Sequence, residues 1–74
     1  MPRAPQVSAA KLIRVLKKLS FVEHVERGTS HLVLSHPDGR RTVIVRHPGT
    51  LPKGTLGAIL RDLKISPDDL RKLL

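Results

Sequence analysis

The sequence predicts an α+β domain, with a three-stranded antiparallel sheet and helices on one of its faces, in the order α-β-β-β-α-α. The main observation is that apolar and polar residues alternate in two short runs within residues 31–45, as in half-buried strands. Between the runs, Pro37-Asp38-Gly39 supplies a fixed φ and then a residue that tolerates positive φ, which is typical of a hairpin turn. Before and after these strands in the sequence, apolar residues recur with helical spacing.

Length and composition limit the kind of protein this can be. The 74 residues leave room for one domain, which we expect to span residues 1–74, and its core must be aliphatic because Phe21 is the only Phe, Tyr or Trp. The absence of cysteine excludes disulfides, thiolate metal sites and a cysteine nucleophile. The sequence has neither a signal-peptide core nor an apolar run of about 20 residues, so we expect a cytoplasmic protein without a membrane span.

The charge of the chain indicates a polyanionic partner. Fourteen Lys and Arg against six Asp and Glu give a formal net charge of +8, and the basic residues are spread along the whole sequence. Nucleic acid fits this balance through counterion release from phosphates. An anionic membrane or an acidic protein fits the same charge, but on so small a domain we favour nucleic acid.

The first helix is predicted over residues 8–19. Ser8 has the chemistry of an N-cap, and apolar residues follow it at helical spacing. Lys11 and Arg14 lie on or beside the polar side of this helix. They can belong to an ordinary solvated face or can face a phosphate backbone, and both interpretations stay open.

A first strand is predicted over residues 21–27, followed by a two-residue turn at Gly28-Thr29. With a three-residue loop in the hairpin, the predicted register pairs Val25 with Leu32, Leu32 with Ile44, Glu26 with His31, and His31 with Val45. His47 then lies one diagonal step from His31, about 7–8 Å away. One sheet face holds Val25, Leu32, Leu34, Thr42 and Ile44. The other, more polar face holds Glu26, His31, Val33, Val43, Val45 and His47.

Two helices are predicted after the sheet. The first spans residues 53–63 and buries a leucine-rich stripe, while Gly57 and Ala58 are expected to allow close approach to the sheet or to a ligand. The second spans residues 67–74, because Ser66 is a suitable cap and Pro67 a favoured first helical residue.

This order of elements on a basic chain is the layout of a double-stranded-RNA-binding-domain-like fold, and several short motifs make the resemblance specific. The chain resembles the HicA family, the small mRNA-interferase toxins of toxin-antitoxin pairs. The match extends over nearly the whole chain, and its motifs are Pro5-Gln6-Val7-Ser8, Gly28-Thr29-Ser30-His31, His36-Pro37-Asp38-Gly39-Arg40-Arg41, Gly54-Thr55-Leu56, Ile59-Leu60-Arg61 and Ile65-Ser66.

The resemblance implies a type II toxin that acts as a metal-independent endoribonuclease, with its functional histidine at His31 and no cofactor. It also implies neutralisation by a HicB-type antitoxin encoded nearby, and we expect the free toxin to be a monomer. Glu26 and His47 are possible auxiliary groups. The residues expected to contact RNA are Lys11, Arg14, Ser30, Arg46 and Lys53.

The residues alone leave a plainer interpretation open. Imidazole titrates in a range useful for taking the 2′-hydroxyl proton, yet a histidine at the start of a strand can simply be exposed. Only its position in the family motif favours a catalytic His31, whereas no role is expected for His24 or His36. We predict no metal site. The alternative function is a non-catalytic RNA-binding module that uses the same basic surface.

Overall fold

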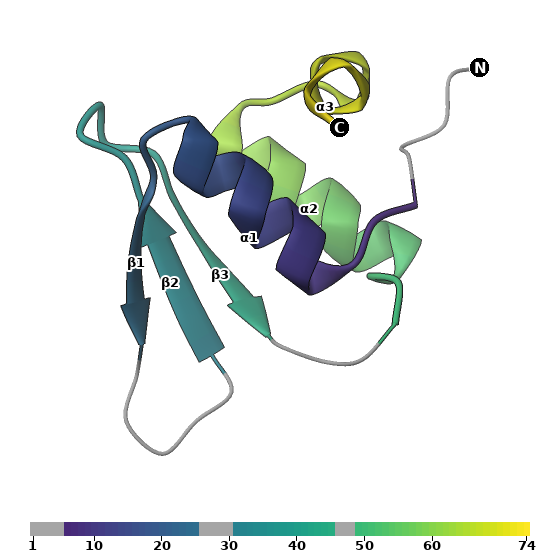
Figure 1. The fold of residues 1–74 in the computed structure, drawn as a ribbon, viewed down its shortest axis with the longest axis horizontal. Helices are drawn as coiled ribbons and strands as arrows, with labels where there is room; N and C mark the ends of the chain where they lie inside the picture. Colours follow the sequence, from purple (N-terminus) through teal and green to yellow (C-terminus); the bar gives the residue numbers. More distant parts are fainter. Residues whose placement is uncertain (1–5, 26–30, 46–48) are drawn as a thin grey trace.

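The computed structural model describes residues 6–25, 31–45 and 49–74 and has the predicted α+β order (Figure 1). The strands form one antiparallel sheet in the order β1-β2-β3. The elements are α1 (Ala9–Lys18), β1 (Val22–Val25), β2 (His31–Ser35), β3 (Arg41–Val45), α2 (Lys53–Leu63) and α3 (Pro67–Leu73). Among the described residues, no helix is long and apolar enough to cross a membrane.

Serine side chains fix the starts of two helices, as predicted. The Ser8 hydroxyl accepts a hydrogen bond from the Lys11 backbone N–H (3.1 Å), and the Ser66 hydroxyl accepts one from Asp69 (3.0 Å). Each bond satisfies an N–H group that has no partner within its helix. The first strand begins at Val22, one residue later than predicted, because the Phe21 N–H instead donates to the Leu16 carbonyl at the end of α1 (3.1 Å).

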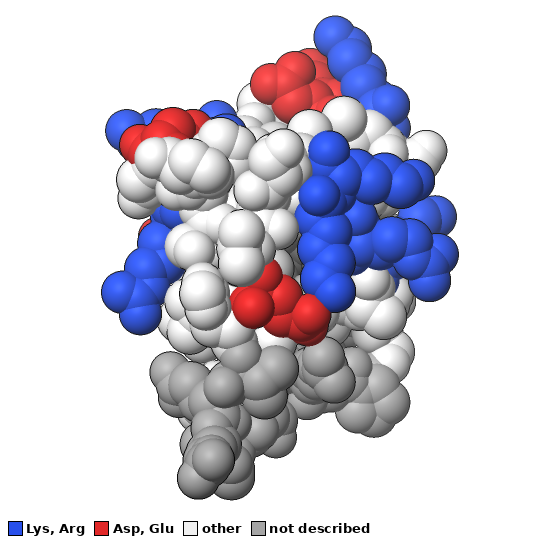
Figure 2. Space-filling view, turned by 60° about the vertical axis from the view of Figure 1, so that its left-hand side comes forward, with Lys and Arg blue, Asp and Glu red and all other residues white. Residues whose placement is uncertain are grey.

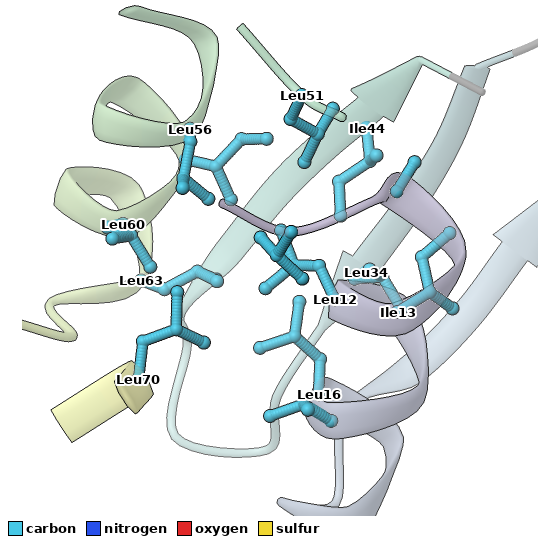
Figure 3. Packing of buried hydrophobic residues seen from close by; sticks show 14 of the residues in the cluster. Leu12, Ile13, Leu16, Leu34, Ile44, Leu51, Leu56, Leu60, Leu63 and Leu70 are labelled. Atoms are coloured by element: carbon cyan, nitrogen blue, oxygen red, sulfur yellow. The ribbon is translucent and has the colours of Figure 1, made fainter. Parts of the chain in front are cut away.

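The hydrophobic core lies between the helices and one face of the sheet. Figure 1 shows α1 and α2 together on the same side of the sheet, and Figure 3 shows their side chains meeting those of the strands. Leu70 is fully buried and anchors the short α3 to this core. The largest fully buried side chains are Leu12, Leu16, Leu32, Leu34, Ile44, Leu63 and Leu70.

The strand register is the predicted one wherever the strands are described. Val25 pairs with Leu32, Leu32 with Ile44, and His31 with Val45. The three-residue hairpin loop is also confirmed: the His36 N–H donates to the Arg40 carbonyl (2.9 Å), and Gly39 has a φ of 102°. Consequently the buried residues of the inner face include Leu32, Leu34, Thr42 and Ile44, as predicted.

The segment before α1 is joined to the segment before α2. Leu51 donates a backbone hydrogen bond to the Val7 carbonyl (2.9 Å), and Ser8 forms an isolated antiparallel bridge with Thr50. Val7 and Leu51 are both buried in the core. The N-terminal ends of α1 and α2 therefore lie side by side.

The predicted close approach of Gly57 and Ala58 to the sheet is wrong, whereas their approach to a ligand stays a prediction. A Cβ added at Gly57 would meet no atom within 4 Å, and Ala58 is exposed. Glycine inside a helix costs conformational entropy without providing a contact here. We expect Gly57→Ala to raise the free energy of unfolding by about 0.5–1 kcal/mol, measured by urea denaturation.

Gly39→Ala is the matched control for Gly57→Ala. The space around Gly39 is equally open, but its positive φ is strained for alanine, so we expect this variant to be destabilised. Equal effects of the two substitutions would contradict this explanation.

Candidate active site

His31 is the first residue of β2 and its side chain is exposed. The next residue, Leu32, is buried in the core, and side chains alternate along a strand. The imidazole therefore lies on the sheet face that the helices do not cover, beside its cross-strand partner Val45. We call this sheet face the open face. The position of His31 on it is the one predicted from the sequence.

The register places further side chains on the open face. Val22 and His24 come from β1, Val33 and Ser35 from β2, and Arg41 and Val43 from β3. His24 Nε2 and Ser35 Oγ are 3.3 Å apart, within hydrogen-bonding distance. With His31 and Val45, these residues form a surface on which none of the described side chains is acidic.

One residue of the open face differs from the expectation of a polar surface. Val33 is only 6% exposed, whereas Val43 beside it is 46% exposed. Val33 lies in the central strand, flanked by His24 on one side and Val43 on the other, so its neighbours cover it. It does not belong to the hydrophobic core on the other side of the sheet.

The predicted partners of His31 are only partly described. Glu26, Ser30, Arg46 and His47 lie outside the described residues, so the pairing of Glu26 with His31 and the diagonal position of His47 stay predictions. Of the predicted RNA contacts, the structure describes Lys11, Arg14 and Lys53, and all three are exposed.

These three cations belong to the helix layer and not to the open face. Lys11 and Arg14 are on α1, and Lys53 is the first residue of α2. Figure 2 shows Lys and Arg side chains gathered into a basic patch, and the exposed cations of α1 are Lys11, Arg14, Lys17 and Lys18.

The hairpin tip, residues 36–40, has contacts that explain its motif structurally. His36 Nδ1 accepts a hydrogen bond from the Asp38 N–H (3.1 Å), while Nε2 faces the Leu19 carbonyl at 3.1 Å. This pattern assigns the proton to Nε2, and it fastens the tip to the end of α1. His36 is thus a structural residue, which agrees with the absence of a predicted role.

Arg40 fastens the same tip to α2. Its Nε donates to Asp38 Oδ2 (2.8 Å), another guanidinium N–H donates to the Leu63 carbonyl (2.9 Å), and its cationic carbon lies 5.2 Å from the Phe21 ring centroid. The backbone N–H of Arg40, followed by its guanidinium, lowers the pKa of Asp38. Stability from the ionised carboxylate is therefore present above about pH 4 and lost as the pH falls through the lowered pKa.

Three polar residues of the open face have no role predicted from the sequence: His24, Ser35 and Arg41. The signal was present in the register, since Ser35 follows His31 by four positions on the same side of β2 and pairs with Arg41. No group of three or more His, Asp or Glu side chains within the described part of the chain is placed to hold a metal ion.

Comparison with known proteins identifies the family. A search of curated proteins finds no match. A family model described as the HicA toxin of bacterial toxin-antitoxin matches residues 9–65, which extend from the start of α1 to just beyond α2 and include the open face with His24 and His31. The chain therefore belongs to the HicA family of bacterial toxins.

Proposed function

We propose that this chain is the toxin of a type II toxin-antitoxin pair and acts as a metal-independent endoribonuclease, with His31 as its catalytic residue. The observation that carries the proposal is the position of His31, an exposed imidazole on a surface without described acidic side chains, in a toxin family member of net charge +8. A chain with this net charge attracts the phosphates of RNA.

RNA supplies its own nucleophile, the 2′-hydroxyl, so the protein needs to supply only groups that take up and donate protons. His31 takes the proton of a 2′-hydroxyl as general base, and the 2′-oxygen attacks the adjacent phosphorus. As that bond forms, the bond from phosphorus to the 5′-oxygen breaks, and this oxygen takes up a proton. The products are a 2′,3′-cyclic phosphate and a 5′-hydroxyl. His47 is the candidate for the group that protonates the leaving oxygen.

Residues 1–74 act as one domain in the cytoplasm, and the free toxin is a monomer. A HicB-type antitoxin neutralises it by covering the cationic surface, since charges that attract RNA also attract an acidic protein and one occupant excludes the other. Lys11, Arg14, Ser30, Arg46 and Lys53 contact the RNA, with Glu26 as an auxiliary group beside His31.

The test is incubation of the purified chain with single-stranded RNA in a buffer that contains a metal chelator. We expect fragments with 5′-hydroxyl ends, and we expect equimolar antitoxin to stop their formation. RNA binding without cleavage, in the chelator and after addition of divalent metal ions, would instead favour the non-catalytic RNA-binding module.

A further inference from the structure

A hollow lies on the open face, two residues along β2 from His31. It has a volume of about 450 Å³ and is lined by His24, Val33, Ser35 and Arg41. The four residues come from all three strands, so the rigid sheet holds them in place. Neither the predicted RNA contacts nor the proposed catalytic step uses this hollow.

We propose that this hollow is a nucleobase subsite, which holds a base of the RNA strand close to the phosphodiester bond that breaks after His31 takes the 2′-hydroxyl proton. The inference rests on the proposed function and adds the binding of the substrate on the open face. It also assigns positions to three residues, with His24 and Arg41 flanking the faces of the base and Ser35 beside its polar groups.

The chemistry of the lining fits an unstacked base. Val33 provides an apolar floor, while the imidazole of His24 and the guanidinium of Arg41 are planar groups of the kind on which RNA bases stack. Ser35 Oγ lies 3.3 Å from His24 Nε2 and can exchange this hydrogen bond for one to a base edge. Arg41 is exposed and can also bind the phosphate next to that base.

The distance from His31 fits a neighbouring nucleotide. Residues on one side of a strand are about 7 Å apart, so Val33 lies about 7 Å and Ser35 about 13 Å from His31 along β2. Stacked nucleotides rise about 3.4 Å each and extended ones rise more, so the hollow is within a few nucleotides of the imidazole. A base held there would fix the position of the scissile phosphate.

Charge distinguishes RNA from a protein as the occupant. The half-exposed valines of the open face, Val22, Val43 and Val45, would suit a protein surface equally well. Arg41, however, is the one described cation of this face and lines the hollow, whose lining holds no acidic residue; Asp38 and Asp62 line a separate hollow on the other side of Arg41. RNA matches both features, because its anionic phosphates suit Arg41 and its flat, partly apolar bases suit the Val33 floor.

The experiment compares His24→Ala and Arg41→Ala with Arg61→Ala, which removes an exposed arginine from α2. All three are made in the His31→Ala background, and affinity for a short single-stranded RNA is measured at one salt concentration. We expect the first two variants to bind about 5- to 150-fold more weakly, the range for loss of one stacked base, and the control to bind within a few-fold.

A second measurement tests whether the subsite lies next to the cleaved bond. The variants are made with His31 intact, and the cut sites in a random-sequence RNA pool are sequenced. We expect His24→Ala to weaken the base preference at one position next to the cut. His24→Phe keeps an aromatic ring but loses the hydrogen bond to Ser35, so it should retain RNA affinity and change that base preference.

The outcomes separate this inference from the proposed function. If His24→Ala and Arg41→Ala lose RNA affinity but the chain with His31 intact does not cleave RNA, the subsite would be supported and the proposed catalysis refuted. Unchanged affinity and an unchanged cut-site pattern in a cleaving enzyme would overturn the subsite alone. Loss of antitoxin binding without loss of RNA binding would identify the open face as a protein-docking surface and would also overturn it.

Discussion

His31→Ala is expected to lower the rate of RNA cleavage by about 10²–10⁴-fold, the usual contribution of a general acid or base, and to abolish toxicity in cells. The physical reason is the loss of the imidazole that takes the 2′-hydroxyl proton. Single-turnover rates at saturating RNA measure this effect without a contribution from affinity.

The fold of this variant should be intact, because the His31 side chain is exposed on the open face, away from Leu32 and Leu34 in the core. Thermal unfolding checks this directly. Most RNA affinity should also remain, since Lys and Arg supply the phosphate contacts. Val45→Ala, which truncates the residue opposite His31, is the control for local damage to the strand end and should cleave within a few-fold of wild type. Full cleavage by folded His31→Ala protein would overturn the catalytic assignment.

Leu34→Ala is expected to destabilise the protein by about 2–5 kcal/mol, the cost of a cavity at a fully buried leucine. Leu34 has no exposed surface and lies in the central strand, facing the helices. A chain of this size has a free energy of unfolding of only about 4–11 kcal/mol, so the variant should lose much of its stability.

Urea denaturation measures the effect of Leu34→Ala, with Val43→Ala as the control on the neighbouring strand. Val43 is 46% exposed on the open face, so its truncation should cost less than about 1 kcal/mol. Similar midpoints for the two variants would contradict the assignment of the core to the helix-covered face.

The sequence predicted the architecture well where local chemistry decides it. Ser8 and Ser66 indicated where two helices start, because a serine cap acts within its own turn. The Pro37-Asp38-Gly39 loop indicated the register of the whole hairpin. The alternation of apolar and polar residues along β2 and β3 then predicted which side chains face the core and which lie on the open face.

Features that depend on distant parts of the chain could not be predicted in the same way. The hydrogen bond from Arg40 to the Leu63 carbonyl joins residues 23 positions apart. The burial of Val33 depends on neighbours in two other strands, and the empty space around Gly57 depends on the packing of α2. For the site, sequence placed His31 on its strand but did not show that Lys11, Arg14 and Lys53 belong to the other layer.

The most direct test of the account is cleavage of an RNA that carries a single 2′-deoxynucleotide at one mapped cut site, by the wild-type protein in the presence of a metal chelator. If His31 acts by removing a 2′-hydroxyl proton, the protein should cut the other sites, leaving 2′,3′-cyclic phosphates, and should leave the modified site intact. Cleavage at the 2′-deoxy position at the normal rate would contradict the account.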